Sequence, residues 1–449
     1  MADDQTDTKE TASAGGALDR MFRLRESGTS VRTEVIAGAT TFLAMAYIVF
    51  VNPGILGETG MDTGAVFVAT CLAAAIGTAV MGLWARYPIA QAPGMGLNAF
   101  FAFTVVLGMG VPWETALAAT LVSGVLFFVL AVTGVREAII DAIPMQLKLA
   151  VGAGIGLFIA FIGLGNAGLV VPHEATFVTL GDLTAPGTML AIFGILATAL
   201  FLLRGIRGAV FYGIIVTSIV GVIFGIVPLP SAVLSAPPSI APTFGAALVN
   251  LPELLTAQMV VVVFTMLFVD LFDTTGTLIA VANQAGMLKD GQLPRANRAL
   301  VSDSVATMAG AVLGTSTTTS YIESSAGVGA GGRTGLTSVV TSGFFLLALF
   351  FSPLLAVVTA EVTAPALIIV GLMMAKGLGE IDWNELEYAL PAFIVVLTMP
   401  LTYSIANGIA LGLFLFPLAM TFRGRARDVH PMMWVLAVAF LVYFVFLLE

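Results

Sequence analysis

The sequence is poor in the charged residues that proteins in water depend on. Only 10% of its 449 residues are charged, against about a quarter in a soluble domain. By contrast, 58% are apolar, and the mean hydropathy is +1.02. Long apolar runs recur from residue 35 to the C-terminus, as in membrane-spanning helices. We therefore predict an all-α polytopic protein of the cell membrane, with the lipid bilayer as its solvent.

The chain also lacks residues that bind metals or form disulfides. Cys71 is the single cysteine, which excludes an internal disulfide. The two histidines, His173 and His430, lie far apart at the edges of apolar segments. A zinc site built from cysteine and histidine is therefore excluded, and we expect no metal and no other cofactor.

Signatures of catalysis are missing as well. The pattern G-x-x-x-x-G-K-[ST] does not occur, so the chain does not hydrolyse ATP through a P-loop. The sequence offers no paired nucleophile and base, so we predict no catalytic residues and no enzyme activity. If the protein moves a solute across the membrane, an ion gradient must drive the movement.

The few basic residues predict the orientation in the membrane. Arg20, Arg23, Arg25 and Arg32 precede the first apolar segment, so the N-terminus is expected to be cytoplasmic. Residues 1–29 lack the apolar core of a signal peptide and are typical of a disordered acidic tail. Since the sequence has no basic stripe, we expect no nucleic-acid partner.

The two halves of the chain are related by their pattern. A proline-rich stretch at 228–242 separates two sets of apolar segments. An offset of 225 residues places the span 113–133 on 338–358, and Asn98 on Glu323. Seven crossings, an odd number, separate equivalent segments, so the second half is predicted to be inverted. Many secondary transporters build a midplane site from such inverted repeats.

Two aspartates interrupt the apolar segment 257–288. In FVDLFDTTGTL, residues 268–278, Asp270 and Asp273 are three residues apart and so share one helix face. An ionised carboxylate at the bilayer centre costs roughly 2.5–3.5 kcal/mol, so the pair must face a protein interior or a water-filled cavity. The alternatives are a polar cluster that stabilises the helix, or an aspartate capping a half-helix that begins near Thr274.

A second polar stretch, GTSTTTSYIESSAGVGAGGRTG at 314–335, lies between two apolar spans. It contains six glycines, a run of hydroxyl side chains and Glu323. Unsatisfied backbone groups cost several kcal/mol in hydrocarbon, so this stretch cannot face lipid. Buried between helices, it can present backbone N–H groups and Glu323 to a ligand. If it were instead a loop outside the membrane, every later arginine would fall on the unexpected side.

A third stretch, QAPGMGLNAFFAF at 91–103, breaks regular structure with proline and glycine before a short apolar segment. Asn98 offers both a donor and an acceptor to the edge of a heterocycle. A phenylalanine such as Phe100 can stack on the face of the heterocycle. For any single phenylalanine here, contact with lipid or with the protein core is the simpler alternative.

These three stretches together resemble the nucleobase–cation symporter 2 superfamily, in its purine branch of AzgA-like adenine, guanine and hypoxanthine permeases. The likeness extends from TEVIAGATTFLAMAYIVFVNPGIL at 33–56 to the end of the chain. It implies about 14 segments in two inverted repeats of seven, with short strand-like breaks in segments 3 and 10, around 94–98 and 320–324. The resemblance also implies a core domain and a gate domain. We assign these parts as a cytoplasmic tail at 1–29, a core domain at 30–140 and 257–361, a gate domain at 141–256 and 362–421, and an extra apolar segment at 422–449.

The resemblance further implies a function. It implies uptake of adenine, guanine or hypoxanthine by proton symport with alternating access, with H⁺ favoured over Na⁺ and a homodimer compatible with the family. It implies that Asn98, Asp270 and Glu323 contact the base and that Asp273 matters for transport. We assign proton coupling to Asp273 and Glu323, and base stacking to Phe100.

Two alternative functions stay open. One is an anion transporter of the sulfate/bicarbonate type on the same fold. The predicted site holds three acids and no basic residue, which argues against an anion as the substrate. The other is a cation channel lined by aspartate and glutamate. Glycine-rich broken segments in two inverted halves favour alternating access over a continuous pore.

Overall fold

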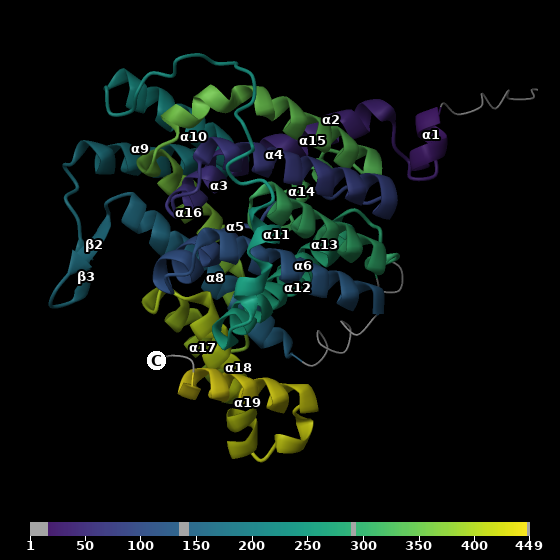
Figure 1. Cartoon of the computed structure of the whole chain (residues 1–449). Coiled ribbons are helices and arrows are strands. Elements are labelled where there is room, and N and C mark those ends of the chain that lie inside the picture. Colours follow the sequence, from purple (N-terminus) through teal and green to yellow (C-terminus); the bar gives the residue numbers. More distant parts are fainter. Residues whose placement is uncertain (1–16, 134–142, 289–292, 447–449) are drawn as a thin grey trace, which may run out of the picture.

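The structure is a computed structural model that describes residues 17–133, 143–288 and 293–446. Helices make up most of this part of the chain (Figure 1). Within it, nine helices are long and apolar enough to cross a membrane. The predicted all-α polytopic membrane protein is therefore confirmed.

The first half alternates long apolar helices with short breaks. Its elements are α1 (Ala17–Phe22), α2 (Val31–Met45), α3 (Ile48–Gly57), α4 (Thr63–Val80), the π-helical turn η1 (Met81–Ala85), β1 (Gln91–Pro93), α5 (Met95–Ala99), the π-helix η2 (Phe100–Gly108), α6 (Trp113–Thr133), α8 (Met145–Asn166), β2 (Val170–His173), β3 (Phe177–Leu180), α9 (Pro186–Leu203), α10 (Ala209–Ile223), α11 (Ala246–Val249) and the 3₁₀ turn η3 (Leu251–Leu254).

The second half repeats this alternation with a longer first helix. Its elements are α12 (Ala257–Gln284), α13 (Ala296–Leu313), β4 (Thr318–Ser320), α14 (Ser324–Gly329), α15 (Gly335–Ala348), the 3₁₀ segment η4 (Leu349–Val357), α16 (Ala360–Met374), the 3₁₀ segment η5 (Ala375–Glu380), α17 (Leu386–Leu401), α18 (Ile405–Phe422), the 3₁₀ turn η6 (Ala426–Asp428) and α19 (Pro431–Phe446).

Polar residues at the helix starts explain several of these boundaries. Ser30, Asp62 and Thr256 each accept a hydrogen bond from a backbone N–H in the first turn of α2, α4 and α12, respectively. Such caps satisfy donors that the helix itself leaves free. The apolar runs then continue each helix through the bilayer.

Elements from the two halves lie side by side. In Figure 1, α2, α4 and α15 lie together toward one end, and α17, α18 and α19 lie at the other; α2 and α4 both pack on α15. Strand β1 pairs with β4 in antiparallel register, with Gln91 opposite Ser320 and Pro93 opposite Thr318. Strands β2 and β3 form a hairpin that projects from the helices.

The short strands lie slightly earlier in the chain than the family resemblance implied. Strand structure was expected around 94–98 and 320–324, whereas β1 ends at Pro93 and β4 ends at Ser320. Gly94 already caps a short helix, and Tyr321 follows β4 directly. The residues expected on strands therefore lie mostly in the turns and short helices that follow them.

One alternative and one expectation raised by the sequence differ from the structure. Helix α12 runs without interruption through Thr274, so no half-helix begins there for an aspartate to cap. Residues 17–29 are ordered as α1 and a turn, because Phe22 and Leu24 are buried against Leu336. Residues 1–16 of the predicted tail lie outside the described residues, as does the predicted boundary between 140 and 141.

Candidate functional site

A small cavity lies where the two halves of the chain meet. It is bounded by the break between α2 and α3, the turn from β1 into α5, the middle of α12 and the turn from β4 into α14. Helix α16 closes it with Val370 and Met374, and its volume is about 70 Å³. Asp273 and Glu323 both line it, so the structure brings these two predicted residues together.

Tyrosine and threonine hydroxyls surround the two carboxylates. Tyr47, in the break between α2 and α3, is buried and donates a hydrogen bond to Oε1 of Glu323 at 2.6 Å. Thr319 on β4 also lines the cavity, and its hydroxyl lies 2.7 Å from that of Thr274. The cavity wall therefore offers acceptors from two acids and groups that can both donate and accept.

Two glycines let the chain pass close to this cavity. A Cβ atom on Gly94 would collide with the side chain of Thr319, and one on Gly96 would collide with Ile155. Both glycines line the cavity. The glycines of the third polar stretch are therefore explained by close approach of the backbone to β4 and α8.

Asp270 lies behind the cavity wall. It is 2% exposed and accepts hydrogen bonds from the hydroxyls of Thr274, at 3.4 Å, and Thr307, at 3.5 Å. Its carboxyl group faces that of Asp303 on α13. Oδ1 of Asp303 accepts from Nε2 of Gln91 at 2.9 Å and from Oγ of Ser320 at 3.0 Å. This network connects α12 and α13 to β1 and β4.

Asn98 and Phe100 lie apart from the described lining of the cavity. The buried Asn98 accepts a hydrogen bond from Ser316 at Oδ1 and donates one to the carbonyl of Pro93 at 3.4 Å. Phe100 is fully buried in the main hydrophobic core, at the start of η2. Asn98 thus connects α5 to the chain just before β4. Phe100 makes a contact with the protein core, which was the simpler alternative to stacking on a base.

Sequence reasoning missed two side chains of this region. Asp303 is an acid within an apolar span, and the cost of a carboxylate in the bilayer, the same signal that singled out Asp270, could have found it. Tyr47 lies in a segment that reads as one continuous apolar helix from 35 to 52, and only the structure reveals the break there. Within the described residues, acids, cysteines and histidines form no group of three suited to a metal ion.

A multi-pass helical protein with a polar, carboxylate-lined cavity buried between its two halves is a membrane transport protein by class. The particular family follows from comparison with known proteins: the chain belongs to the permease family whose model, Xan_ur_permease, matches residues 32–411. Permeases move solutes and are not enzymes, in agreement with the sequence prediction.

Two curated relatives match nearly the whole chain. The guanine/hypoxanthine permease PbuG of Bacillus subtilis is 54% identical over 439 residues, covering 96% of this chain and 100% of the relative. The adenine permease AdeQ of Escherichia coli is 46% identical over 441 residues, covering 98% of each.

A solved structure has the same fold. The transmembrane domain of the cyanobacterial bicarbonate transporter BicA superposes with a TM-score of 0.61 at 16% identity, covering 84% of this chain and 97% of that domain. At this identity the likeness concerns the fold alone.

Proposed function

We propose that this protein takes up purine nucleobases, namely adenine, guanine or hypoxanthine, by proton symport with alternating access. The observation that carries the proposal is the cavity that Asp273 and Glu323 line together with Tyr47 and Thr319. The names of the relatives, which are guanine/hypoxanthine and adenine permeases, support the choice of substrate.

The chemistry of the cavity suits a neutral planar base. A purine carries N–H donors and ring-nitrogen acceptors along its edges. The carboxylates of Asp273 and Glu323 can accept hydrogen bonds from N–H groups of the base. The hydroxyls of Tyr47 and Thr319 can either donate or accept a hydrogen bond. Hydrogen bonds to a charged group in a buried site are among the stronger ones, so these acids give both affinity and orientation.

Asp270 and Asn98, which the resemblance assigns to the base, have an indirect role in this proposal. Asp270 holds the hydroxyl of Thr274, which in turn contacts Thr319 on the cavity wall. Asn98 holds Ser316, two residues before β4. Both therefore position β4, which lines the cavity, and do not contact the base themselves.

The size of the cavity supports alternating access. Its volume of about 70 Å³ is far below the roughly 300–1,000 Å³ of typical ligand pockets. A base can enter only if the walls move apart, and the wall formed by Val370 and Met374 belongs to the predicted gate domain. The antiparallel pairing of β1 with β4 is the arrangement that two inverted repeats produce. Movement of the gate against the core would open the cavity to one side at a time.

The anion alternative fits the cavity poorly. Its described lining contains two acids and no lysine, arginine or histidine, so an anion would meet like charge. The channel alternative would need a continuous path, whereas this cavity is small and closed on one side by α16.

Uptake into vesicles tests the proposal directly. Purified protein in phospholipid vesicles is given labelled adenine, guanine, hypoxanthine, uracil or sulfate under an inward proton gradient or an inward Na⁺ gradient. We expect accumulation of at least one purine, driven by protons, with sulfate excluded. Accumulation of sulfate, or purine uptake that follows only the Na⁺ gradient, would contradict the substrate or the coupling ion, respectively.

A further inference from the structure

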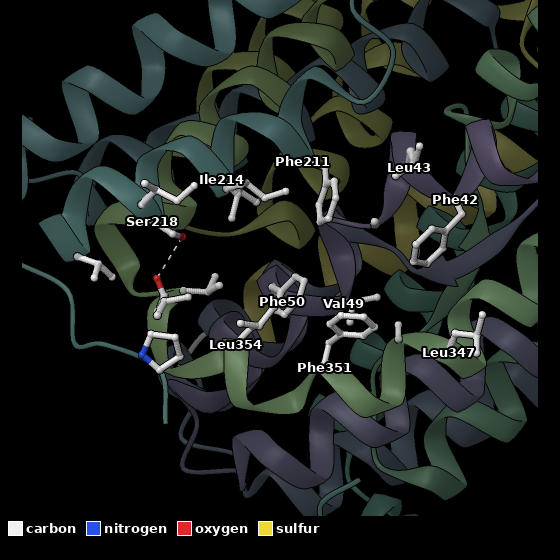
Figure 2. A pocket seen from close by; sticks show the side chains of 18 of the residues that line it. Phe42, Leu43, Val49, Phe50, Phe211, Ile214, Ser218, Leu347, Phe351 and Leu354 are labelled. Carbon is white, nitrogen blue, oxygen red and sulfur yellow. Dashed lines mark hydrogen bonds between the residues drawn. The ribbon is translucent and has the colours of Figure 1, made fainter. Parts of the chain in front are cut away.

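A second, larger cavity lies on another face of the helices, away from the acids. This apolar groove encloses about 740 Å³ between α2 and α3 on one side, α10 on another, and α15 with η4 on a third. Figure 2 shows Phe42, Phe50, Phe211 and Phe351 around it. Every described side chain that lines it is apolar except Ser218.

The single polar group of the groove is already satisfied. Ser218 on α10 donates a hydrogen bond to the carbonyl of Val357 at 3.3 Å, drawn as a dashed line in Figure 2. An apolar space without polar partners does not hold water. The occupant of the groove must therefore be hydrocarbon.

The groove opens to the outside of the protein at membrane helices. Ile219 and Ile223 on α10 and Leu347 on α15 line it and are 54%, 72% and 57% exposed. On helices that belong to a multi-pass membrane protein, such exposed apolar side chains face the acyl chains of the bilayer. Bilayer lipid therefore has direct access to the groove.

Among the described residues, positive charge lies near one end of the groove. Gly208, at the start of α10, packs against the carbonyl of Leu43, which lines the groove. Arg204 and Arg207 closely precede Gly208 in the chain and are exposed. The described structure places neither in an ion pair, and Arg207 makes only a 3.4 Å hydrogen bond to the carbonyl of Gly329. At the other end are Leu229 and Pro230, where the segment 228–256 carries one charged residue, Glu253.

We propose that the groove is a binding site for an anionic phospholipid, with one acyl chain in the groove and the phosphate held by Arg204 and Arg207. Guanidinium groups bind phosphate through paired hydrogen bonds, which gives the headgroup a fixed place. The acyl chain then fills the space between α10 and the wall formed by α2 and η4. A lipid in this position adds contacts between α10 and η4, which the Ser218 hydrogen bond also joins across the groove.

Quenching by brominated lipids tests this site. The native tryptophans Trp84, Trp113, Trp383 and Trp434 are replaced by phenylalanine. Phe351→Trp then places a reporter in the groove, and Leu196→Trp places a matched control on the exposed face of α9. Each protein is put into phosphatidylcholine nanodiscs that contain increasing amounts of either brominated phosphatidylglycerol or brominated phosphatidylcholine.

We expect the Phe351→Trp reporter to be quenched at a lower fraction of phosphatidylglycerol than of phosphatidylcholine, by about five-fold for each arginine. The Leu196→Trp control should show little headgroup preference. Arg204→Gln with Arg207→Gln should abolish the preference in the groove, whereas Arg427→Gln, an exposed arginine on η6, should leave it intact. Equal quenching at both reporters, or a preference that survives loss of both arginines, would show ordinary bilayer contact and overturn the site.

Thermal unfolding gives a second measurement that needs no tryptophan replacement. The otherwise unaltered protein should unfold at a higher temperature in phosphatidylglycerol than in phosphatidylcholine nanodiscs. This difference should vanish in the Arg204→Gln/Arg207→Gln variant and persist in Arg427→Gln; a difference unchanged in the double variant would contradict the proposal. Neither measurement involves a nucleobase, so the result is independent of the proposed transport activity.

Discussion

Two buried acidic regions of the membrane part differ in what surrounds their carboxylates. Glu34, near the start of α2, is fully buried against the N-terminus of α15. Its carboxylate accepts five hydrogen bonds, which come from the backbone N–H groups of Arg333 (2.9 Å), Thr334 (3.3 Å) and Thr337 (3.1 Å) and from the hydroxyls of Thr334 (2.8 Å) and Thr337 (2.6 Å).

The acids behind and around the cavity have fewer donors. Asp270 accepts two long hydrogen bonds from threonine hydroxyls, and Oδ2 of Asp303 has no hydrogen-bond partner in the described structure. Glu323 receives one hydrogen bond from Tyr47. The charged residues that the structure describes as buried are all acidic, namely Glu34, Asp270, Asp303 and Glu387, so no buried cation neutralises this region.

The difference separates a structural acid from functional ones. A carboxylate surrounded by fixed N–H and O–H donors is stable as an anion and holds two helices together. Carboxylates with few donors and no buried cation are costly to keep charged, so they gain most from a ligand that donates hydrogen bonds or from a proton. The comparison can be tested by removing the acids one at a time.

Glu34→Ala should have the largest effect, and it should act on stability. Five donors at the N-terminus of α15 lose their acceptor at a fully buried site, which should cost about 3–5 kcal/mol in the free energy of unfolding. The unfolding temperature in nanodiscs measures this loss. Glu58→Ala, at an exposed position after α3, is the matched control and should change little. If Glu34→Ala unfolds at the wild-type temperature, the five hydrogen bonds do not anchor α15.

Glu323→Gln and Asp273→Asn should impair function at nearly unchanged stability. Glu323→Gln replaces a carboxylate acceptor by an amide, so purine affinity should fall about 5- to 150-fold, the equivalent of roughly 1–3 kcal/mol. Asp273→Asn cannot bind or release a proton, so accumulation driven by a proton gradient should collapse while exchange of bound purine across the membrane persists. Binding, accumulation and counterflow are measured for both, with Glu58→Gln as control. An Asp273→Asn protein that still concentrates purine would assign the coupling to another acid.

Asn98→Ala should have a smaller effect on the same binding constant. The substitution removes the hydrogen bonds to Ser316 and Pro93 that hold α5 against the chain before β4. Since Asn98 does not line the cavity, the loss acts through position, and affinity should fall about 2- to 10-fold. A loss as large as that of Glu323→Gln would instead indicate direct contact of Asn98 with the base.

The sequence predicted the class of fold well because the bilayer imposes strong rules. Apolar runs of about 20 residues must be helices, so α6 and α9 follow from hydropathy. Polar glycine-rich stretches must be buried, so the burial of the segment that carries β4 follows from composition, whereas the strand itself was implied only by the family resemblance. Intramembrane acids are costly, which singled out Asp270, Asp273 and Glu323 correctly as buried or half-buried groups.

Hydropathy could not distinguish which acids reach the cavity. Asp270 and Asp273 share a helix face, yet only Asp273 lines the cavity, whereas Asp270 lies against Thr307 of α13. The turn at Ala46 and Tyr47 was invisible for a related reason. Both residues keep α-helical dihedral angles, and a local change of hydrogen-bond pattern within an apolar run changes no residue type. Such details depend on tertiary packing between segments far apart in the sequence.

Asp303→Asn should have the smallest effect on stability, although Asp303 is as deeply buried as Glu34. Asparagine keeps the Oδ1 acceptor for Gln91 and Ser320 and turns an N–H toward Asp270, where two carboxyl groups now face each other. The gain of a donor should offset the loss of a charge, so the free energy of unfolding should change by less than about 1 kcal/mol. Asp303→Ala, which also loses both hydrogen bonds at Oδ1, should cost more. If Asp303→Asn destabilises the protein as much as Glu34→Ala does, then Asp303 is a fixed structural anion too, and the distinction between the two acidic regions fails.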